Sequence, residues 1–109
     1  MMASLGGKIF AGLIAVVALT GHAAAGPVIF SAWKVSNLSL DECKEHAAVT
    51  LRHFGFQDIQ KLESSVFADR AQYSATIRCA TDLKAVFIVV AGPDSDVCSQ
   101  FADLLNENF

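Results

Sequence analysis

The sequence predicts a two-layer α+β domain in which two amphipathic helices cover one face of an antiparallel sheet. Three observations support this fold class. A capped helical segment follows a β-rich run near residue 28, alternating or wholly apolar runs then follow one another with tight turns between them, and a second amphipathic segment comes last. The predicted order is therefore strand, helix, three strands and helix.

The segment that precedes this domain has the features of a secretory signal peptide. Lys8 is the only charged side chain in the first 33 residues, and residues 9–19 form an unbroken run of apolar or small residues. This run has 11 residues, whereas crossing a bilayer takes about 20. Residues 23–25 fit the small-residue pattern that signal peptidase reads, so we expect cleavage between Ala25 and Gly26. An uncleaved N-terminal anchor is the alternative.

Cleavage at this point divides the chain into a signal peptide, residues 1–25, and a single α+β domain, residues 26–109. Because Lys8 is the only charge removed, the net charge moves from −3 to about −4. Such an acidic domain lacks the clustered Lys and Arg that nucleic acid or an anionic membrane surface requires. We therefore expect a periplasmic or secreted protein that binds no nucleic acid and does not stay inserted in the membrane.

The first strand and the first helix have clear sequence signals. Residues 28–36 are rich in β-branched and aromatic side chains and predict a strand. Ser39 and Glu42 have the spacing of a capping box, in which each side chain accepts a hydrogen bond from the other residue's N–H. The helix is predicted to run to Phe54, before Gly55, which can take a left-handed conformation. Its apolar stripe consists of Leu40, Cys43, Ala47, Thr50, Leu51 and Phe54.

Three strands are predicted in the middle of the domain. The first, Ile59 to Phe67, is interrupted at residues 63–65 by a bend or a bulge. Tyr73 to Cys79 alternates between apolar and polar residues, as a half-buried strand does. Ala85 to Ala91 is almost wholly apolar, as expected of a central strand. Tight turns between these strands predict an antiparallel meander.

The last helix is predicted to start at Asp94 or Ser95 and to run to about Asn106. A glycine-proline turn before this start could form an anion cradle, but Asp94 and Asp96 would repel a phosphate, so the turn is better explained as a helix cap. The apolar stripe of this last helix consists of Val97, Phe101, Leu104 and Leu105. With both helices on one face, the predicted architecture is related to ferredoxin-like folds.

Several of these features together resemble a group of natural proteins. The pattern runs from Cys43 on a capped helix, through Gly55 and Phe56 at its end and Tyr73 to Cys79, to an apolar run that ends at residues 92–93. It is similar to small, uncharacterised exported proteins of Gram-negative bacteria. The resemblance implies an exported α+β domain without an agreed activity, so it assigns no functional residues.

Three cysteines in an exported domain predict one disulfide and one remaining thiol. Chain entropy does not choose the pair, because each possible loop would contribute about 3–4 kcal/mol. Cys43 and Cys79 are both expected to point into the layer between helix and sheet, so we predict that they pair. Cys98 then stays as a possible free thiol or as the link of a covalent homodimer. Asp94 and Asp96 oppose its ionisation, and no C-x-x-C motif is present, which favours a packing role.

No group of residues in the sequence forms a catalytic, cofactor or metal site. His46 and His53 are two helical turns apart, about 10.5 Å, which is too far to share a metal ion. Glu42 and His46 could chelate a metal but have no third ligand nearby. We therefore expect no cofactor, no metal and no catalytic residue. The alternative is a small thiol- or histidine-dependent periplasmic enzyme that uses Cys98 with His46 or His53.

The favoured function is an accessory or binding module of unknown ligand that acts by its surface. This surface would be the uncovered face of the sheet or a homodimer interface. Trp33 and Tyr73 could line a binding groove on such a face, but packing in the core or at a sheet edge is the favoured interpretation, since aromatic side chains mostly serve packing.

Overall fold

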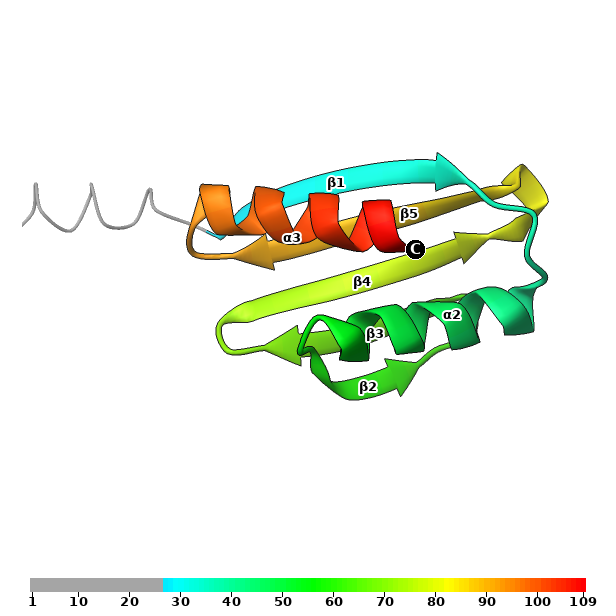
Figure 1. Ribbon diagram of the computed structural model, residues 1–109, viewed down its shortest axis with the longest axis horizontal. Helices are drawn as coiled ribbons and strands as arrows, with labels where there is room; N and C mark the ends of the chain where they lie inside the picture. Colours follow the sequence, from blue (N-terminus) through cyan, green and yellow to red (C-terminus); the bar gives the residue numbers. More distant parts are fainter. Residues whose placement is uncertain (1–26) are drawn as a thin grey trace, which may run out of the picture.

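The computed structural model describes residues 27–109, so the predicted signal peptide and its cleavage site at Ala25 and Gly26 lie outside the described residues. Figure 1 shows the elements in their places. In chain order they are strand β1 (Val28–Val35), helix α2 (Leu40–His53), strands β2 (Gln57–Lys61), β3 (Ser65–Arg70) and β4 (Tyr73–Ala80), the short 3-10 helix η1 (Thr81–Leu83), strand β5 (Ala85–Gly92) and helix α3 (Ser95–Asn108).

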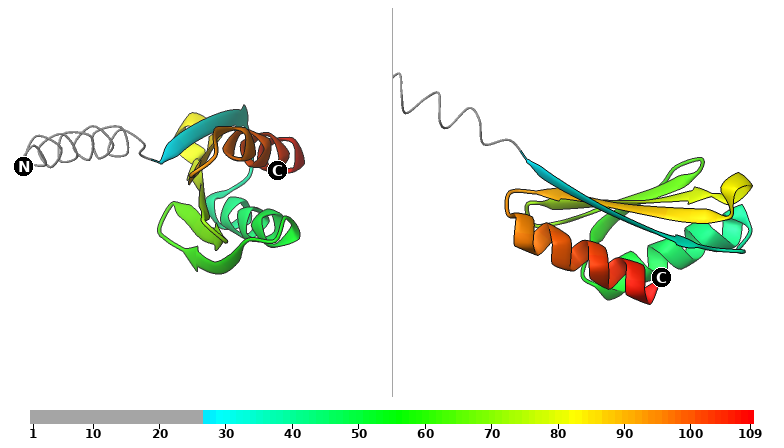
Figure 2. Two further views of the ribbon diagram at one scale, coloured as in Figure 1. Left: turned by 90° about the vertical axis from the view of Figure 1, so that its left-hand side faces the viewer. Right: turned by 90° about the horizontal axis from the view of Figure 1, so that it is seen from above.

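The five strands form one antiparallel sheet in the order β1-β5-β4-β3-β2. Strands β2 to β5 make a meander, and β1 pairs with β5, the strand farthest from it in the chain. Both helices lie on the same face of this sheet, as Figure 2 shows from above. Helix α3 packs on β1 and β5, and helix α2 packs on β2, β3 and β4. The predicted fold class is confirmed.

The predicted order is wrong in one respect, because the single strand expected from Ile59 to Phe67 is two strands. Strand β2 ends at Lys61, and β3 begins at Ser65. The Leu62 N–H donates a hydrogen bond to the Ser65 carbonyl oxygen at 2.8 Å and closes the hairpin. Residues 63–65, expected to form a bend or a bulge inside one strand, therefore belong to the turn that joins β2 to the start of β3. The observed order is strand, helix, four strands and helix.

The core lies between the two helices and the sheet face that they cover. Along β3, β4 and β5, alternate residues point to this face and are buried: Val66, Ala68, Ala75, Ile77, Cys79, Val86, Ile88 and Val90. The helices contribute Cys43, Ala47, Ala48, Leu51, Cys98, Ala102 and Leu105. Phe56, just before β2, is also buried in this layer. The buried alanines on both helices let α2 and α3 lie close to the sheet.

The helix caps follow the sequence signals. The capping box of α2 is confirmed, because Glu42 N–H donates to Ser39 Oγ at 3.2 Å and Ser39 N–H donates to Glu42 Oε1 at 3.1 Å. Gly55, just past the end of α2, has a φ of +84° and so takes the left-handed conformation expected there. At the start of α3, Asp94 Oδ1 accepts a hydrogen bond from Val97 N–H at 3.0 Å.

Candidate functional site

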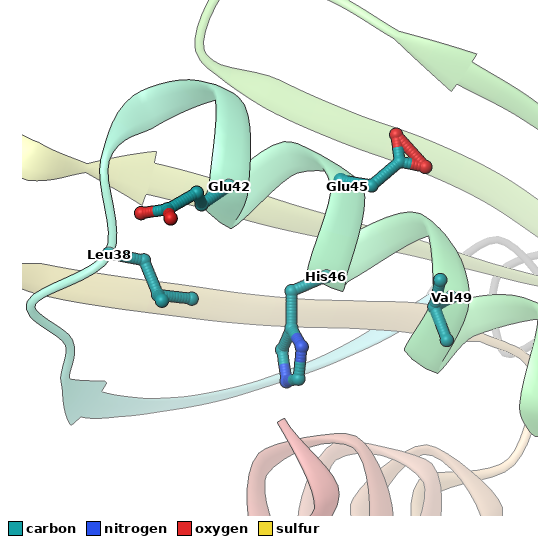
Figure 3. A pocket seen from close by; sticks show the side chains of 5 residues that line it. All are labelled: Leu38, Glu42, Glu45, His46 and Val49. Atoms are coloured by element: carbon teal, nitrogen blue, oxygen red, sulfur yellow. The ribbon is translucent and has the colours of Figure 1, made fainter.

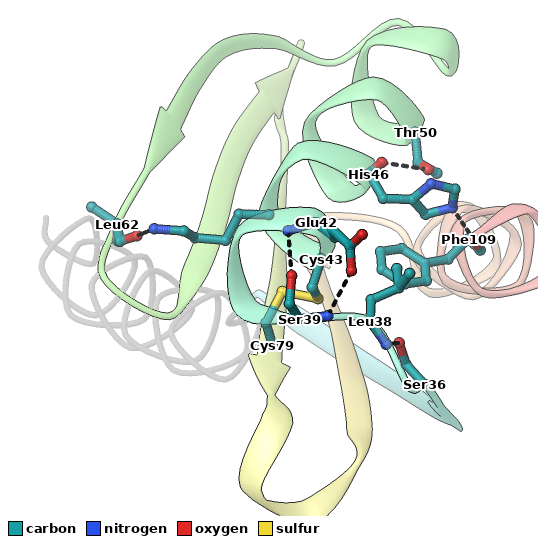
Figure 4. The surroundings of a disulfide bond; sticks show 11 residues. Ser36, Leu38, Ser39, Glu42, Cys43, His46, Thr50, Leu62, Cys79 and Phe109 are labelled. Atoms are coloured by element: carbon teal, nitrogen blue, oxygen red, sulfur yellow. Dashed lines mark hydrogen bonds between the residues drawn. A yellow bond between two sulfur atoms is a disulfide. The ribbon is translucent and has the colours of Figure 1, made fainter.

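A disulfide between Cys43 on α2 and Cys79 on β4 links the helix layer to the sheet (Figure 4). The two Cα atoms are 6.1 Å apart, and both residues are buried. This is the pair predicted from the faces of the helix and the strand. The cysteines are 36 positions apart in the sequence, and closing such a loop restricts the unfolded chain by about 4 kcal/mol. The disulfide therefore supports the fold and carries no reactive group at the surface.

Cys98 is fully buried in the first turn of α3, where a packing role fits it better than a surface thiol. Its Sγ lies 3.7 Å from the Val28 carbonyl oxygen of β1. Burial, followed by the nearby Asp94 carboxylate, raises the pKa of this thiol. A buried thiol of raised pKa stays protonated at neutral pH, and it is not exposed to form the covalent homodimer considered from the sequence.

The two histidines lie on the helix layer, away from the Cys98 sulfur. His46 packs edge-on against the ring of Phe109, with ring centroids 4.6 Å apart, and its Nε2 forms a hydrogen bond with the Phe109 carbonyl oxygen. Phe109 follows the C-terminal end of α3, about 16 Å along the helix axis from Cys98. His53 packs against Phe54 instead. Across residues 27–109 the ring contacts and side-chain hydrogen bonds of the two histidines are thus with phenylalanines and not with Cys98, whose Sγ lies near Val28.

A shallow groove runs along the exposed face of α2. It has a volume of about 360 Å³ and is lined by Leu38, Glu42, Glu45, His46 and Val49 (Figure 3). A smaller hollow of about 270 Å³ continues from it, sharing His46 and Val49 and reaching Asn108 of α3. The groove therefore lies over helix α2 and continues toward α3.

The carboxylates of this groove already have partners within the chain. The hydrogen bond from the Ser39 backbone lowers the pKa of Glu42. The Lys61 ammonium, 2.6 Å from Glu45 Oε1, lowers the pKa of Glu45 by its hydrogen bond and its charge. Across residues 27–109 no group of three or more His, Cys, Asp or Glu side chains could hold a metal ion. The groove thus offers no unengaged acid for general acid-base chemistry.

The sheet face opposite the helices carries an apolar patch. Side chains alternate along a strand, so the residues of β1 and β5 that do not face the core point to this outer face. We call the following residues the outer patch: Ile29, Trp33, Val35, Phe87 and Val89. Trp33 is opposite Phe87 in the β1–β5 register, and Phe87 is opposite Arg78 on β4. The patch is therefore continuous across two neighbouring strands.

Trp33 corrects a sequence-based expectation. It lies on the edge strand β1, one of the two places expected for it, but 61% of its surface is exposed on the outer face, so it is not packed there. Tyr73 does pack: its ring lies 5.6 Å from that of Phe101 and covers Gly92 on the helix side of the sheet. The two aromatic residues therefore lie on opposite faces and share no groove. Lys34, the only charged residue of β1, lies on the helix side, where its Nζ donates to the Asn106 carbonyl oxygen, so charge did not mark the outer face of this strand.

Strand β1 also has a free edge, because no described strand pairs with it on the side away from β5. Ser36 N–H donates to the Lys84 carbonyl oxygen at 3.0 Å, which makes this pair a hydrogen-bonded one. Such pairs alternate along an antiparallel ladder, so the even-numbered residues of β1 bond to β5 and the odd-numbered ones face outward. The free N–H and C=O groups belong to Ile29, Ser31, Trp33 and Val35.

The other edge strand, β2, has a different character. It has five residues, and its register with β3 shifts between Gln57 and Gln60. Asp58 has a φ of +55°, outside the extended region. Lys61 is paired with Glu45 of α2 at 2.6 Å. A short, charged and irregular edge of this kind resists pairing with another strand.

Comparison of the chain with protein-family models, with curated proteins and with solved structures gave no match. Neither helix within residues 27–109 is both long enough and apolar enough to cross a membrane. The outer patch and the free edge of β1 adjoin each other on the described surface, because Ile29, Trp33 and Val35 belong to both.

Proposed function

We propose that the chain is an exported binding module, periplasmic or secreted, that acts through its sheet surface and is not an enzyme. Export is supported by the signal-like character of residues 1–25. The Cys43–Cys79 disulfide also supports export, because disulfides form and persist in oxidising compartments such as the bacterial periplasm.

The observation that carries the binding role is the outer patch. Ile29 and Val35 expose 65% and 66% of their surfaces, and Trp33 exposes 61%. Large apolar side chains that adjoin one another at the surface are characteristic of interaction sites, and Trp is enriched among the residues that dominate binding energy. The polar groups of the α2 groove, by contrast, are bonded within the chain.

The alternative, an enzyme that uses Cys98 with His46 or His53, requires an ionisable sulfur within hydrogen-bond reach of an imidazole. The burial of Cys98 beneath β1 and its raised pKa argue against such a nucleophile. We expect a thiol reagent to modify Cys98 about a hundredfold more slowly in the folded protein than after unfolding in guanidinium. Rapid modification of the folded protein would favour the enzyme.

Export is tested by producing the full chain in a Gram-negative bacterium and measuring the intact mass in each cell fraction. The expected species is periplasmic, begins at Gly26 and contains one disulfide and one free thiol. A periplasmic species that retains residues 1–25 contradicts the predicted cleavage, and a species with all three thiols free contradicts the Cys43–Cys79 disulfide.

The binding role is tested in the same cells with a photo-reactive phenylalanine analogue in place of Phe87 on the outer patch. A matched control carries the analogue in place of Val49, which is exposed on α2. Irradiation is expected to give a crosslinked product from position 87 at several times the yield from position 49. Equal yields, or no product from position 87, would count against a binding role for the sheet.

A further inference from the structure

We propose that the partner of β1 is a second copy of this chain, whose own β1 pairs antiparallel with the first about a two-fold axis. This inference rests on the proposed function, since it names the partner of the same sheet surface. The five strands of each copy would then form one continuous sheet with the two β1 strands at its centre. In Figure 1, β1 forms one margin of the sheet.

The free edge of β1 is complementary to itself. A two-fold axis at Ala32 places Ile29 opposite Val35 of the second copy and Ser31 opposite Trp33 of the second copy. These four residues are the ones whose backbone groups face outward. In this register they are all hydrogen-bonded pairs, which gives about eight backbone hydrogen bonds between the copies. Every free backbone group of the edge therefore finds a partner.

The same register extends the outer patch across the axis. Ile29, Trp33 and Val35 of both copies would form one apolar row on the outer face. The two Trp33 side chains occupy diagonal positions about 7–8 Å apart, a separation that aromatic side chains can bridge. Each exposed side chain of the edge thus loses part of its contact with water on pairing, which stabilises the dimer.

Charge does not oppose this pairing. Lys34 is the only charged residue of β1, and its Nζ donates to the Asn106 carbonyl oxygen of α3 at 2.8 Å, on the helix side. It would lie opposite Phe30 of the second copy. Like charges, which destabilise directly opposed pairs, are therefore not brought together across the axis.

The second edge of the sheet favours a closed dimer over an open chain of copies. Pairing of β1 with β2 of another copy would leave free edges at both ends and could continue into a fibre. Strand β2 has five residues against eight in β1, and its register is broken between Gln57 and Gln60. It cannot match β1 along its length, so the two β1 edges are left to pair with each other.

The size of the contact predicts a weak, reversible dimer. A strand of eight residues is about 27 Å long, and with a sheet depth of about 10 Å its edge buries about 300 Å² on each copy. The total of about 600 Å² is below the range of about 1,200–2,000 Å² of stable complexes. We therefore expect a dissociation constant in the micromolar range or weaker.

The register is tested by oxidative crosslinking of two variants, each of which adds one cysteine to the mature, disulfide-containing protein with its buried Cys98. Ala32→Cys places two thiols opposite each other at the axis, with Cα atoms about 4.5 Å apart, within disulfide range. Val35→Cys is the matched control, because its two copies would be about 20 Å apart along the strands. We expect a crosslinked dimer from Ala32→Cys at least tenfold more abundant than from Val35→Cys. Equal yields, or none from a folded Ala32→Cys protein, would overturn the proposal.

The photo-crosslinking at position 87 separates failure of this inference from failure of the proposed function. A product of twice the chain mass supports a second copy. A product with a protein of another mass, together with a monomer in sedimentation, means that the module binds a different partner and the dimer is wrong. If there is no crosslinked product and the chain is a monomer in sedimentation, both the binding role of the sheet and the dimer are contradicted. If Ala32→Cys does not fold, sedimentation of the unmodified chain against Ser31→Pro decides the question.

Discussion

The two edges of the sheet differ in nearly every property that controls strand pairing. Strand β1 keeps an unbroken register with β5 over all eight residues, whereas β2 has five residues and a register shift. The β1 edge exposes Ile29, Trp33 and Val35, whereas β2 carries Asp58 and Lys61. Edge strands are normally protected by the features that β2 has. The difference indicates that one edge is closed to partners and the other is left open.

The two halves of the molecule are also held together differently. Helix α2 and the strands that it covers, β2 to β4, which we call the β2 half, are joined by the Cys43–Cys79 disulfide and by the Lys61–Glu45 ion pair. Helix α3 is joined to β1 by the Lys34 hydrogen bond and by the weak contact of Cys98 Sγ with a carbonyl oxygen. The helix that covers the β2 side of the sheet is therefore held to it by a covalent bond to β4, whereas the helix on the β1 side is held by packing and weaker polar contacts. The following experiments perturb one half or the other.

The largest expected effect comes from removing the disulfide of the β2 half. The double variant Cys43→Ala, Cys79→Ala loses the loop constraint, and we expect the free energy of unfolding to fall by about 4 kcal/mol. Urea denaturation followed by circular dichroism measures this loss. Cys98→Ala is the control, which keeps the disulfide and removes one small buried group. A loss for the double variant no larger than for the control would show that the disulfide contributes little.

The next effect is expected at the junction of β5 with β1. Gly92 is paired with Val28, and a Cβ at this position would overlap the Tyr73 ring. We expect Gly92→Ala to destabilise the fold by about 1–3 kcal/mol, as overpacking does. The same change in a Tyr73→Leu background should cost clearly less, because the clashing ring is gone. Thermal unfolding of the unmodified chain, the two single variants and the double variant gives the coupling between Gly92 and Tyr73. Equal losses of stability in both backgrounds would rule out the ring as the cause.

A smaller effect is expected from a charge on the open edge. Trp33→Lys removes the largest apolar side chain of the outer patch and brings two ammonium groups to diagonal positions across the proposed axis. We expect the dimer dissociation constant to rise at least tenfold, while the free energy of unfolding changes by no more than about 0.5 kcal/mol. Val49→Lys, on exposed α2, is the matched control and should leave association unchanged. Sedimentation velocity over a concentration series measures the dissociation constant of both variants. Equal weakening of the dimer by the two substitutions would place the interface elsewhere.

The smallest effect concerns acid sensitivity in the β2 half. The pKa of Glu45 is lowered from 4.5, first by its hydrogen bond from Lys61 and then by the charge of Lys61. Because the folded pKa is below the unfolded one, the stabilisation is present above pH 4.5 and is lost as the pH falls through the folded value. Lys61→Gln should therefore flatten the decline of stability below pH 4.5. Unfolding midpoints from pH 3 to 7 test this, and an unchanged slope would mean that the ion pair does not form in solution.

Much of the fold was predictable from local signals. The capping box of α2 depends on two residues three positions apart, and the facing of Cys43 and Cys79 depends on helix and strand periodicity. The hairpin at Leu62 was missed because its three turn residues contain neither Gly nor Pro, the residues that usually mark turns. Local sequence thus located the helices more reliably than the strand boundaries.

The candidate site was less predictable, for a different physical reason. Both alternating sets of β1 contain large apolar residues, Phe30 in one and Trp33 in the other, so the strand pattern does not say which set faces the core. Packing of α3 on β1 decides this, and it depends on residues about 70 positions away, such as the Lys34–Asn106 contact. The unpaired edge likewise follows from the pairing of β1 with β5, which local sequence does not specify.

The most direct test of the open edge is sedimentation equilibrium of the mature chain and two proline variants from about 1 μM to 1 mM, the range expected for a weak dimer. Ser31→Pro removes an N–H that faces the free edge of β1, and Lys61→Pro places the same block at the outer side of β2. We expect a monomer–dimer equilibrium for the unmodified chain and for Lys61→Pro, and a monomer at every concentration for folded Ser31→Pro. A monomer at every concentration for the unmodified chain, or equal association of all three proteins, would contradict it.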